Sequence, residues 1–119
     1  MRNIDDQVQV EGTEETVYEY FLSKGWTDGL PVIPPTIERV EAFLAEANVT
    51  SDDIIGVIPP KWVELTVEKL AVNAVMAGCK PEYMPVLVVA IKAMCESAFN
   101  LYGVQATTNP VGPMLSIVA

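Results

Sequence analysis

The chain has 119 residues, enough for one compact domain, and half of them are hydrophobic. Its net charge of −9, with only seven lysines and arginines, argues against binding to nucleic acid or to an anionic membrane surface. There is no histidine, which removes the commonest general base and excludes a Ser-His-Asp or Cys-His site built from this chain alone.

No apolar stretch of the sequence approaches the roughly 20 residues that a membrane-spanning helix needs. The first six residues are polar and acidic, which is unlike a signal peptide, so we expect a cytoplasmic protein. Residues 1–12 show no hydrophobic period, and we interpret them as a flexible acidic arm. Residues 13–119 are expected to form a single α/β domain, the N-terminal part of a larger unit.

The first predicted helix follows Thr13, a residue type that often caps helices, and ends at Gly25. A stiff segment comes next, because its prolines are incompatible with a central strand. Trp26 and Asp28 lie at the start of this segment. An aromatic ring and a carboxylate on a rigid loop suit a pocket wall, so both are candidate ligand contacts. The alternative is a structural turn with Trp26 packed in the core.

The middle of the chain reads as helix, strand, helix and helix. Thr36 should cap a helix that fades near residue 48, and residues 54–58 should form a short strand stopped by two prolines. Residues 61–77 and 83–98 are apolar nearly all round, which predicts two buried helices. We therefore expect helices packed on a small sheet.

The turn between these two helices carries Cys79. Gly78 should end the first helix and Pro81 suits the first turn of the second, which places Cys79 just outside a helix N-terminus. The helix dipole and Lys80 favour the thiolate there, so Cys79 is our candidate catalytic residue. The alternative is a small buried apolar residue at a helix junction. Asn73, expected to be a buried amide, would either hold a loop carbonyl or face a ligand.

The last part of the chain is predicted to contain two strands, over residues 101–106 and 114–119. Thr107, Thr108 and Asn109 follow the first of them and place two hydroxyls and an amide where ligands often bind in open sheets. They are candidate substrate contacts, and the alternative is an ordinary turn. The second strand ends in apolar residues, so we expect a second chain, or the rest of a longer precursor, to complete the sheet.

Three long segments of the sequence, 25–36, 71–83 and 99–108, resemble a known family. It is the largely uncharacterised bacterial family associated with UGSC-motif (seleno)proteins. The resemblance implies a link to selenol or thiol chemistry and chains longer than this one, but it supplies no substrate. This chain lacks the Sec/Cys-Gly-Ser-Cys motif itself, so the resemblance does not extend to autonomous redox activity.

Two functions fit these observations. In the first, the chain is the small chain or N-terminal fragment of a heteromeric cytoplasmic enzyme that acts on a small molecule, with Cys79 near a site at the chain interface. A precursor that cuts itself after Ala119 is a variant of this hypothesis. In the second, the chain is a non-catalytic structural or regulatory subunit that organises a catalytic partner. The sequence identifies no cofactor, and a metal would need ligands from another chain.

Overall fold

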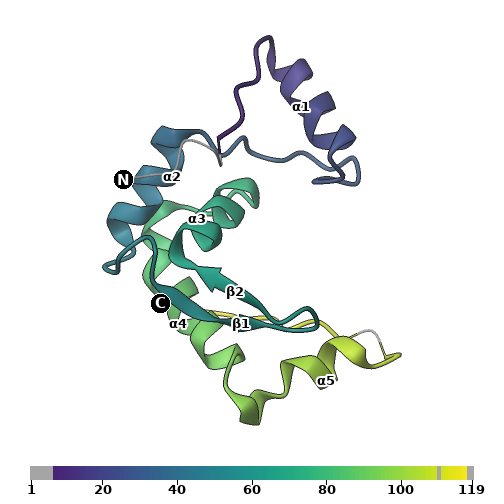
Figure 1. Cartoon of the computed structure of the whole chain (residues 1–119), viewed down its shortest axis with the longest axis vertical. Helices are drawn as coiled ribbons and strands as arrows, with labels where there is room; N and C mark the ends of the chain where they lie inside the picture. Colours follow the sequence, from purple (N-terminus) through teal and green to yellow (C-terminus); the bar gives the residue numbers. More distant parts are fainter. Residues whose placement is uncertain (1–6, 110, 118–119) are drawn as a thin grey trace. The chain divides into compact units, whose positions relative to one another are not determined.

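The computed structural model describes residues 7–109 and 111–117 (Figure 1). Its elements are α1 (Glu14–Ser23), α2 (Ile37–Glu46), β1 (Ile54–Ile58), β2 (Val63–Thr66), α3 (Val67–Met76), the 3₁₀ turn η2 (Pro81–Tyr83), α4 (Met84–Met94), the 3₁₀ turn η3 (Ser97–Phe99) and α5 (Leu101–Ala106). The described residues thus form a mixed α/β structure with a two-stranded antiparallel sheet. The backbone groups into two compact units, Met1–Pro34 and Pro35–Ala119. The predicted division at residue 12 stays a prediction.

The first unit contains α1 and the loop that follows it. The helix begins after Thr13, and Gly25 stands just beyond its end with a φ of +68°, a conformation that suits a residue without a side chain. Phe21 is buried and packs against the ring of Trp26, with 5.6 Å between the ring centroids. The predicted helix is confirmed. Of the predicted arm, residues 7–12 have no regular secondary structure and residues 1–6 lie outside the described residues.

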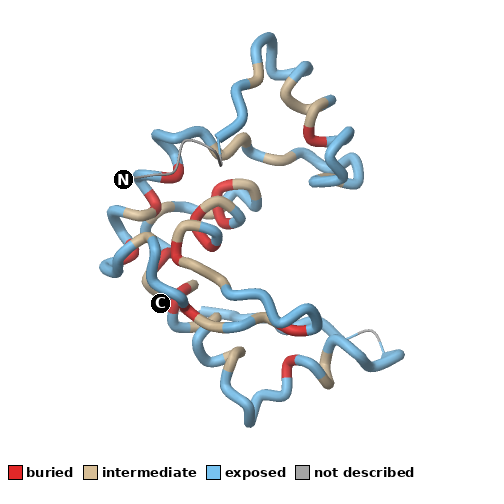
Figure 2. Tube along the Cα trace, viewed as in Figure 1, coloured by how far each residue is buried: buried red, intermediate tan, exposed pale blue. Residues whose placement is uncertain are grey.

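The second unit has one core, between α2, α3, α4 and β1 (Figure 2). Thr36 caps α2 as predicted, because its side-chain oxygen accepts a hydrogen bond from the backbone N–H of Arg39 at 3.4 Å. Each of the three helices turns apolar side chains toward the others. The buried cluster consists of Val40, Phe43, Ala47, Ile55, Val67, Leu70, Ala71, Ala74, Val75, Met84 and Val88.

β1 and β2 form a hairpin beside this core. The register shifts between Ile54 and Gly56, so Ile55 is the extra residue of a bulge, and its side chain is buried in the core. Near the hairpin turn Trp62 stacks on Tyr102 of α5, with 5.7 Å between the ring centroids. The predicted strand over residues 54–58 is confirmed. The stacked rings bring α5 into contact with the hairpin.

Three predicted segments have a different structure. The helix predicted over residues 61–77 starts only at Val67, because residues 63–66 form β2 and pair with β1. The strand predicted over residues 101–106 is the helix α5. Residues 114–117 of the last predicted strand have no regular secondary structure, and residues 118–119 lie outside the described residues. The helix prediction was therefore wrong for residues 61–66 and confirmed for residues 67–76, and the two strand predictions were wrong wherever the structure describes the chain.

Asn100 accounts for the helix that replaces the first of the two predicted strands. Its backbone is left-handed, with a φ of +56°, and its side-chain oxygen accepts a hydrogen bond from the N–H of Gly103 at 3.3 Å. This bond caps the first turn of α5, and Leu101 is buried at the start of the helix. A local cap has thus overridden the strand preference of the apolar residues that follow it.

Within residues 7–109 and 111–117, none of the helices alone has the length and apolar composition of a membrane span. The bent pair Pro81–Met94 and Ser97–Ala106, which meet at 73°, satisfies that test by length and composition when taken together.

Candidate functional site

Cys79 lies in the short connection between α3 and η2. Its backbone N–H donates a hydrogen bond to the carbonyl of Ala74 at 3.0 Å, and its half-buried side chain packs against the core of the second unit. Pro81 occupies the first turn of η2, which continues directly into α4. The predicted position of Cys79 before a helix N-terminus is therefore confirmed. Cys79 and Cys95 are both free thiols.

Asn73 is exposed, so the prediction of a buried amide was wrong. Its side-chain nitrogen donates a hydrogen bond to the carbonyl of Lys69, one turn earlier in α3, at 2.8 Å. The buried side of α3 consists of Val67, Leu70, Ala71, Ala74 and Val75. At about 100° per residue, position 73 falls on the other side of the helix. The amide is satisfied by its own helix and holds no loop carbonyl.

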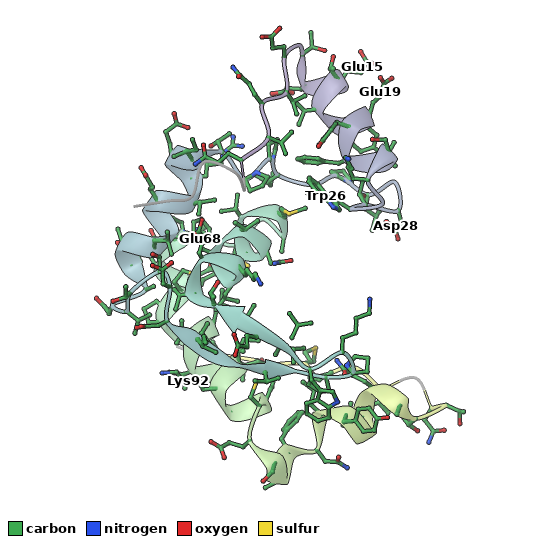
Figure 3. All side chains as sticks on the ribbon, in the orientation of Figure 1. Glu15, Glu19, Trp26, Asp28, Glu68 and Lys92 are labelled. Atoms are coloured by element: carbon green, nitrogen blue, oxygen red, sulfur yellow. The ribbon has the colours of Figure 1, made fainter. Side chains whose placement is uncertain are left out.

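Trp26 and Asp28 belong to the first unit (Figure 3). Trp26 is half exposed, and its ring lies across the edge of Tyr20 with 5.8 Å between centroids. The Asp28 carboxylate accepts a hydrogen bond from the backbone N–H of Leu30 at 3.4 Å, which closes a local turn. Both side chains thus have structural roles in the loop, and their role as ligand contacts stays a prediction.

Thr107, Thr108 and Asn109 form an exposed loop after α5. The backbone N–H of Asn109 donates a hydrogen bond to the hydroxyl of Thr107 at 3.3 Å. The loop follows a helix rather than a strand. The reason for expecting a ligand there, that ligands often bind where the strands of an open sheet end, therefore no longer applies. Figure 1 shows α3 and α5 on opposite sides of the hairpin in that view. Among the described residues, no hydrogen bond or ring contact joins this loop to Cys79 or Asn73.

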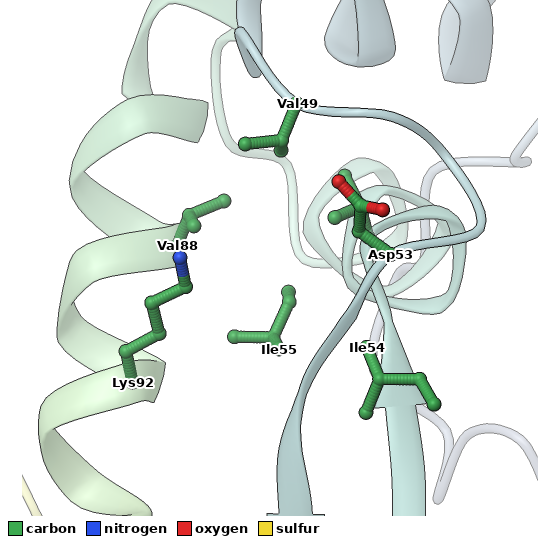
Figure 4. Close-up of a pocket in the computed structure, with 7 residues that line it drawn as sticks. Val49, Asp53, Ile54, Ile55, Val88 and Lys92 are labelled. Atoms are coloured by element: carbon green, nitrogen blue, oxygen red, sulfur yellow. The ribbon is translucent and has the colours of Figure 1, made fainter.

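A hollow of about 200 Å³ lies elsewhere in the second unit, where the link after α2 meets β1, α3 and α4 (Figure 4). Five of the residues that line it are aliphatic, namely Val49, Ile54, Ile55, Val67 and Val88, but most of the surface exposed to the hollow is polar. Two charged side chains also line it, the carboxylate of Asp53 and the ammonium group of Lys92. The hollow is therefore lined by one charged group of each sign, and little apolar surface is open to it.

Asp53 is fixed by its own backbone and that of its neighbours. Its N–H donates to the carbonyl of Thr50 at 3.0 Å, and its Oδ2 accepts from the N–H of Thr50 at 3.2 Å. Its carbonyl accepts from the N–H of Val67, the first residue of α3, also at 3.0 Å. One of these three hydrogen bonds reaches the carboxylate, and the other two hold the backbone of Asp53 directly before β1.

Lys92 projects from the last turn of α4, and its methylene chain runs along the helix beside Val88 (Figure 4). Among the described residues it forms no ion pair with Asp53. Sequence analysis missed both side chains as site residues. The available signals were Lys92 as the one charge in an apolar helix and Asp53 directly before a strand.

Metal ligands do not gather in the part of the chain that the structure describes: no three carboxylates or thiols come together there. No protein-family model, curated protein or solved structure matches this chain. The resemblance to the family associated with UGSC-motif proteins therefore stays a prediction.

Proposed function

We propose that this chain is a non-catalytic subunit that binds a second, different polypeptide through the outer side of α4. The observation that carries the proposal is the composition of that helix. Lys92 is the one charged residue in the eleven-residue sequence of α4. Val86 and Val89 are nevertheless 39% and 66% exposed. A helix that is apolar all round is normally covered on every side, and a partner would supply the missing cover.

Other parts of the second unit also expose apolar side chains. Large hydrophobic side chains are exposed on the hairpin, on the segment before α4, around α5 and in the last described segment. They are Ile54, Val57, Trp62, Val63, Tyr83, Phe99, Tyr102, Val111, Met114, Leu115 and Ile117. Exposed apolar residues in this number, when contiguous, are typical of surfaces that bind other proteins.

The chemistry of the chain favours a polypeptide other than a second copy. Two copies would each carry a net charge of −9 and would repel each other. Within the described residues the sheet has two strands, so each has an outer edge that a partner strand could pair with and thereby complete the sheet. A cytoplasmic location suits this subunit, since both of its cysteines are free thiols.

A charged substitution on α4 tests the proposal. Val89→Glu should abolish copurification of the partner from the native host, because it places a carboxylate in the apolar contact, while the free energy of unfolding stays within about 0.5 kcal/mol of wild type. The wild-type chain should retain one polypeptide in stoichiometric amount, identified by mass spectrometry. Ala45→Glu, at an exposed position of α2, is the matched control and should retain it too.

Three results would contradict the proposal. If the wild-type chain purifies from its host as a monomer, or if Val89→Glu retains the same polypeptide, α4 does not bind a partner. Binding of wild-type chain to vesicles of neutral lipid in place of a polypeptide would also overturn it.

The second candidate is that the chain forms part of a heteromeric enzyme to which Cys79 contributes its thiol. A free, half-buried thiol at the edge of the core favours it, because such a group is accessible to a site that a partner completes. Cys79→Ser separates the two candidates. A non-catalytic subunit predicts unchanged activity of the isolated assembly, whereas loss of activity with the partner still bound would support the enzyme hypothesis.

A further inference from the structure

The outer side of α4 carries a residue pattern that specifies the kind of polypeptide it would bind. Its exposed apolar residues are Val86, Val89 and Ala93. Exposed carboxylates stand at both ends, Glu82 in η2 and Glu96 just beyond the C-cap of α4. We propose that the partner presents to these five residues, the α4 stripe, an amphipathic helix with an apolar centre and a lysine or arginine at each end. This partner chemistry rests on the proposed function, which places a polypeptide on α4 without specifying its structure or charge.

The members of the α4 stripe lie along one line of the helix. Along the sequence they are separated by four, three, four and three residues, an average of about 3.5, which is the repeat of the seam between two packed helices. At about 100° per residue, this line lies on the side of α4 opposite to the buried Met84 and Val88. The stripe therefore has an apolar centre, with an acidic group about one turn beyond it at each end.

The backbone of α4 favours a helix over a strand as the element that covers the stripe. The N–H and C=O groups in the interior of a helix are paired within it, so α4 offers no backbone hydrogen bonds to a partner along this side. A partner segment must then satisfy its own backbone, which a helix does internally and a single strand does not. The valine and alanine side chains of the stripe are short, so a second helix can approach closely and place larger side chains between them.

The charges at the ends of the stripe specify the charge of the partner. Neither Glu82 nor Glu96 forms an ion pair among the residues that the structure describes. A partner that covers the apolar centre removes water from one side of both carboxylates, and a positive charge opposite each one offsets that cost. Lys92 flanks the stripe near its C-terminal end and suits a carboxylate of the partner. The net charge of −9 also attracts a basic segment over a longer range.

Two synthetic helical peptides of equal length test this partner chemistry by fluorescence anisotropy. Both carry a line of leucines at alternating spacings of three and four residues. They differ only at the positions one turn beyond this line, which are lysines in one peptide and glutamates in the other. The lysine peptide should bind the wild-type chain at least about fivefold more tightly at low salt, because it forms ion pairs where the glutamate peptide meets like charges. High salt should reduce the difference, since it screens exposed charges.

A charge reversal in the protein should remove this preference. The Glu82→Lys and Glu96→Lys changes combined should lower the ratio of the two affinities at least about fivefold at low salt. The matched control combines Glu15→Lys and Glu19→Lys, at two exposed positions of α1 in the first unit. It changes the net charge by the same amount and should keep the preference of the wild-type chain. Val89→Glu should weaken the binding of both peptides.

The peptide test can fail while the proposed function stands. If the native host supplies a polypeptide that Val89→Glu loses, α4 binds a partner whatever the peptides do. The partner chemistry itself is overturned if the lysine peptide shows no saturable binding or if the two peptides bind equally. It is also overturned if a folded double variant at residues 82 and 96 keeps the full preference, or if Val89→Glu binds the lysine peptide as tightly as the wild-type chain does.

Discussion

The helices α3 and α4 contribute to the same core, but they differ in what covers them. Five of the ten residues of α3 are buried, and its two exposed residues, Lys69 and Asn73, are polar. Two of the eleven residues of α4, Met84 and Val88, are buried. A polar outer side suits water and needs no further cover, whereas three of the four exposed residues of α4 are apolar, namely Val86, Val89 and Ala93, and the fourth is Lys92.

This difference shows that a hydrophobic helix sequence predicts that its side chains will be buried. It does not predict whether the same chain or a partner covers them. The core of the second unit meets that need fully for α3 and on one side for α4. The remaining side of α4 is therefore the surface on which a partner would have the largest effect. The following predictions test the comparison, from the largest expected effect on stability to the smallest.

The largest loss of stability is expected for a substitution on the inner side of α4. Met84→Ala should lower the free energy of unfolding by about 3 kcal/mol, because the side chain is fully buried and its removal leaves a cavity. Val89→Ala, on the outer side of the same helix, should change it by less than about 0.5 kcal/mol. Urea denaturation followed by circular dichroism measures both. Equal losses at the two positions would mean that the outer side of α4 is covered within the chain itself.

A local capping signal predicted the start of α2, whereas the starts of α3 and α5 were missed although each has a cap. Thr36 marked the start of α2 because a cap depends on residues close by in the sequence. Residues 63–66 form a strand because β1 supplies their partners. The local signal that separates this strand from α3 was missed: Thr66 caps the helix, and its hydroxyl accepts a hydrogen bond from the N–H of Lys69 at 3.2 Å. Asn100 was itself a cap signal, and it could have identified α5.

The predicted site residues also show that local signals locate a residue along the chain better than they identify its neighbours in space. The position of Cys79 beside a helix start followed from Gly78 and Pro81 and is confirmed. Asn73 was assigned to the wrong side of α3, because a helix with many alanines and valines does not define its buried side sharply. The hollow between Asp53 and Lys92 joins residues that are far apart in the sequence, so no motif could reveal it.

A smaller effect is expected where the end of α4 meets the sheet. An added Cβ at Gly56 would lie 2.5 Å from the sulfur of Cys95, the C-cap residue of α4. Gly56→Ala should therefore lower the free energy of unfolding by about 1–3 kcal/mol. Gly112→Ala, which meets no atom within 4 Å, is the control and should be close to neutral. Thermal unfolding of both variants measures the difference.

A double substitution shows whether that loss comes from the contact with α4. Cys95→Ala removes the sulfur that the new methyl group would strike. The Gly56→Ala and Cys95→Ala changes combined should therefore destabilise the chain by less than the sum of the single changes, with a coupling of at least about 0.5 kcal/mol. Additive losses would place the strain either in β1 itself or at the Cβ of residue 95, which would lie 2.9 Å from the new methyl group and is kept in the alanine variant.

The smallest change in stability is expected on the polar outer side of α3. A larger change there would contradict the difference between the two helices. Asn73→Ala should leave the free energy of unfolding unchanged or raise it by a few tenths of a kcal/mol, because alanine favours helix more than asparagine does. The hydrogen bond that is lost is an exposed one to Lys69 in the same helix, and water replaces it. Chemical denaturation of both chains measures whether the free energy of unfolding rises or falls. A loss of about 1–3 kcal/mol would instead be the mark of a buried amide with a distant partner. In that case α3 would need cover on its outer side as α4 does, and α4 would no longer be distinguished as the surface for a partner.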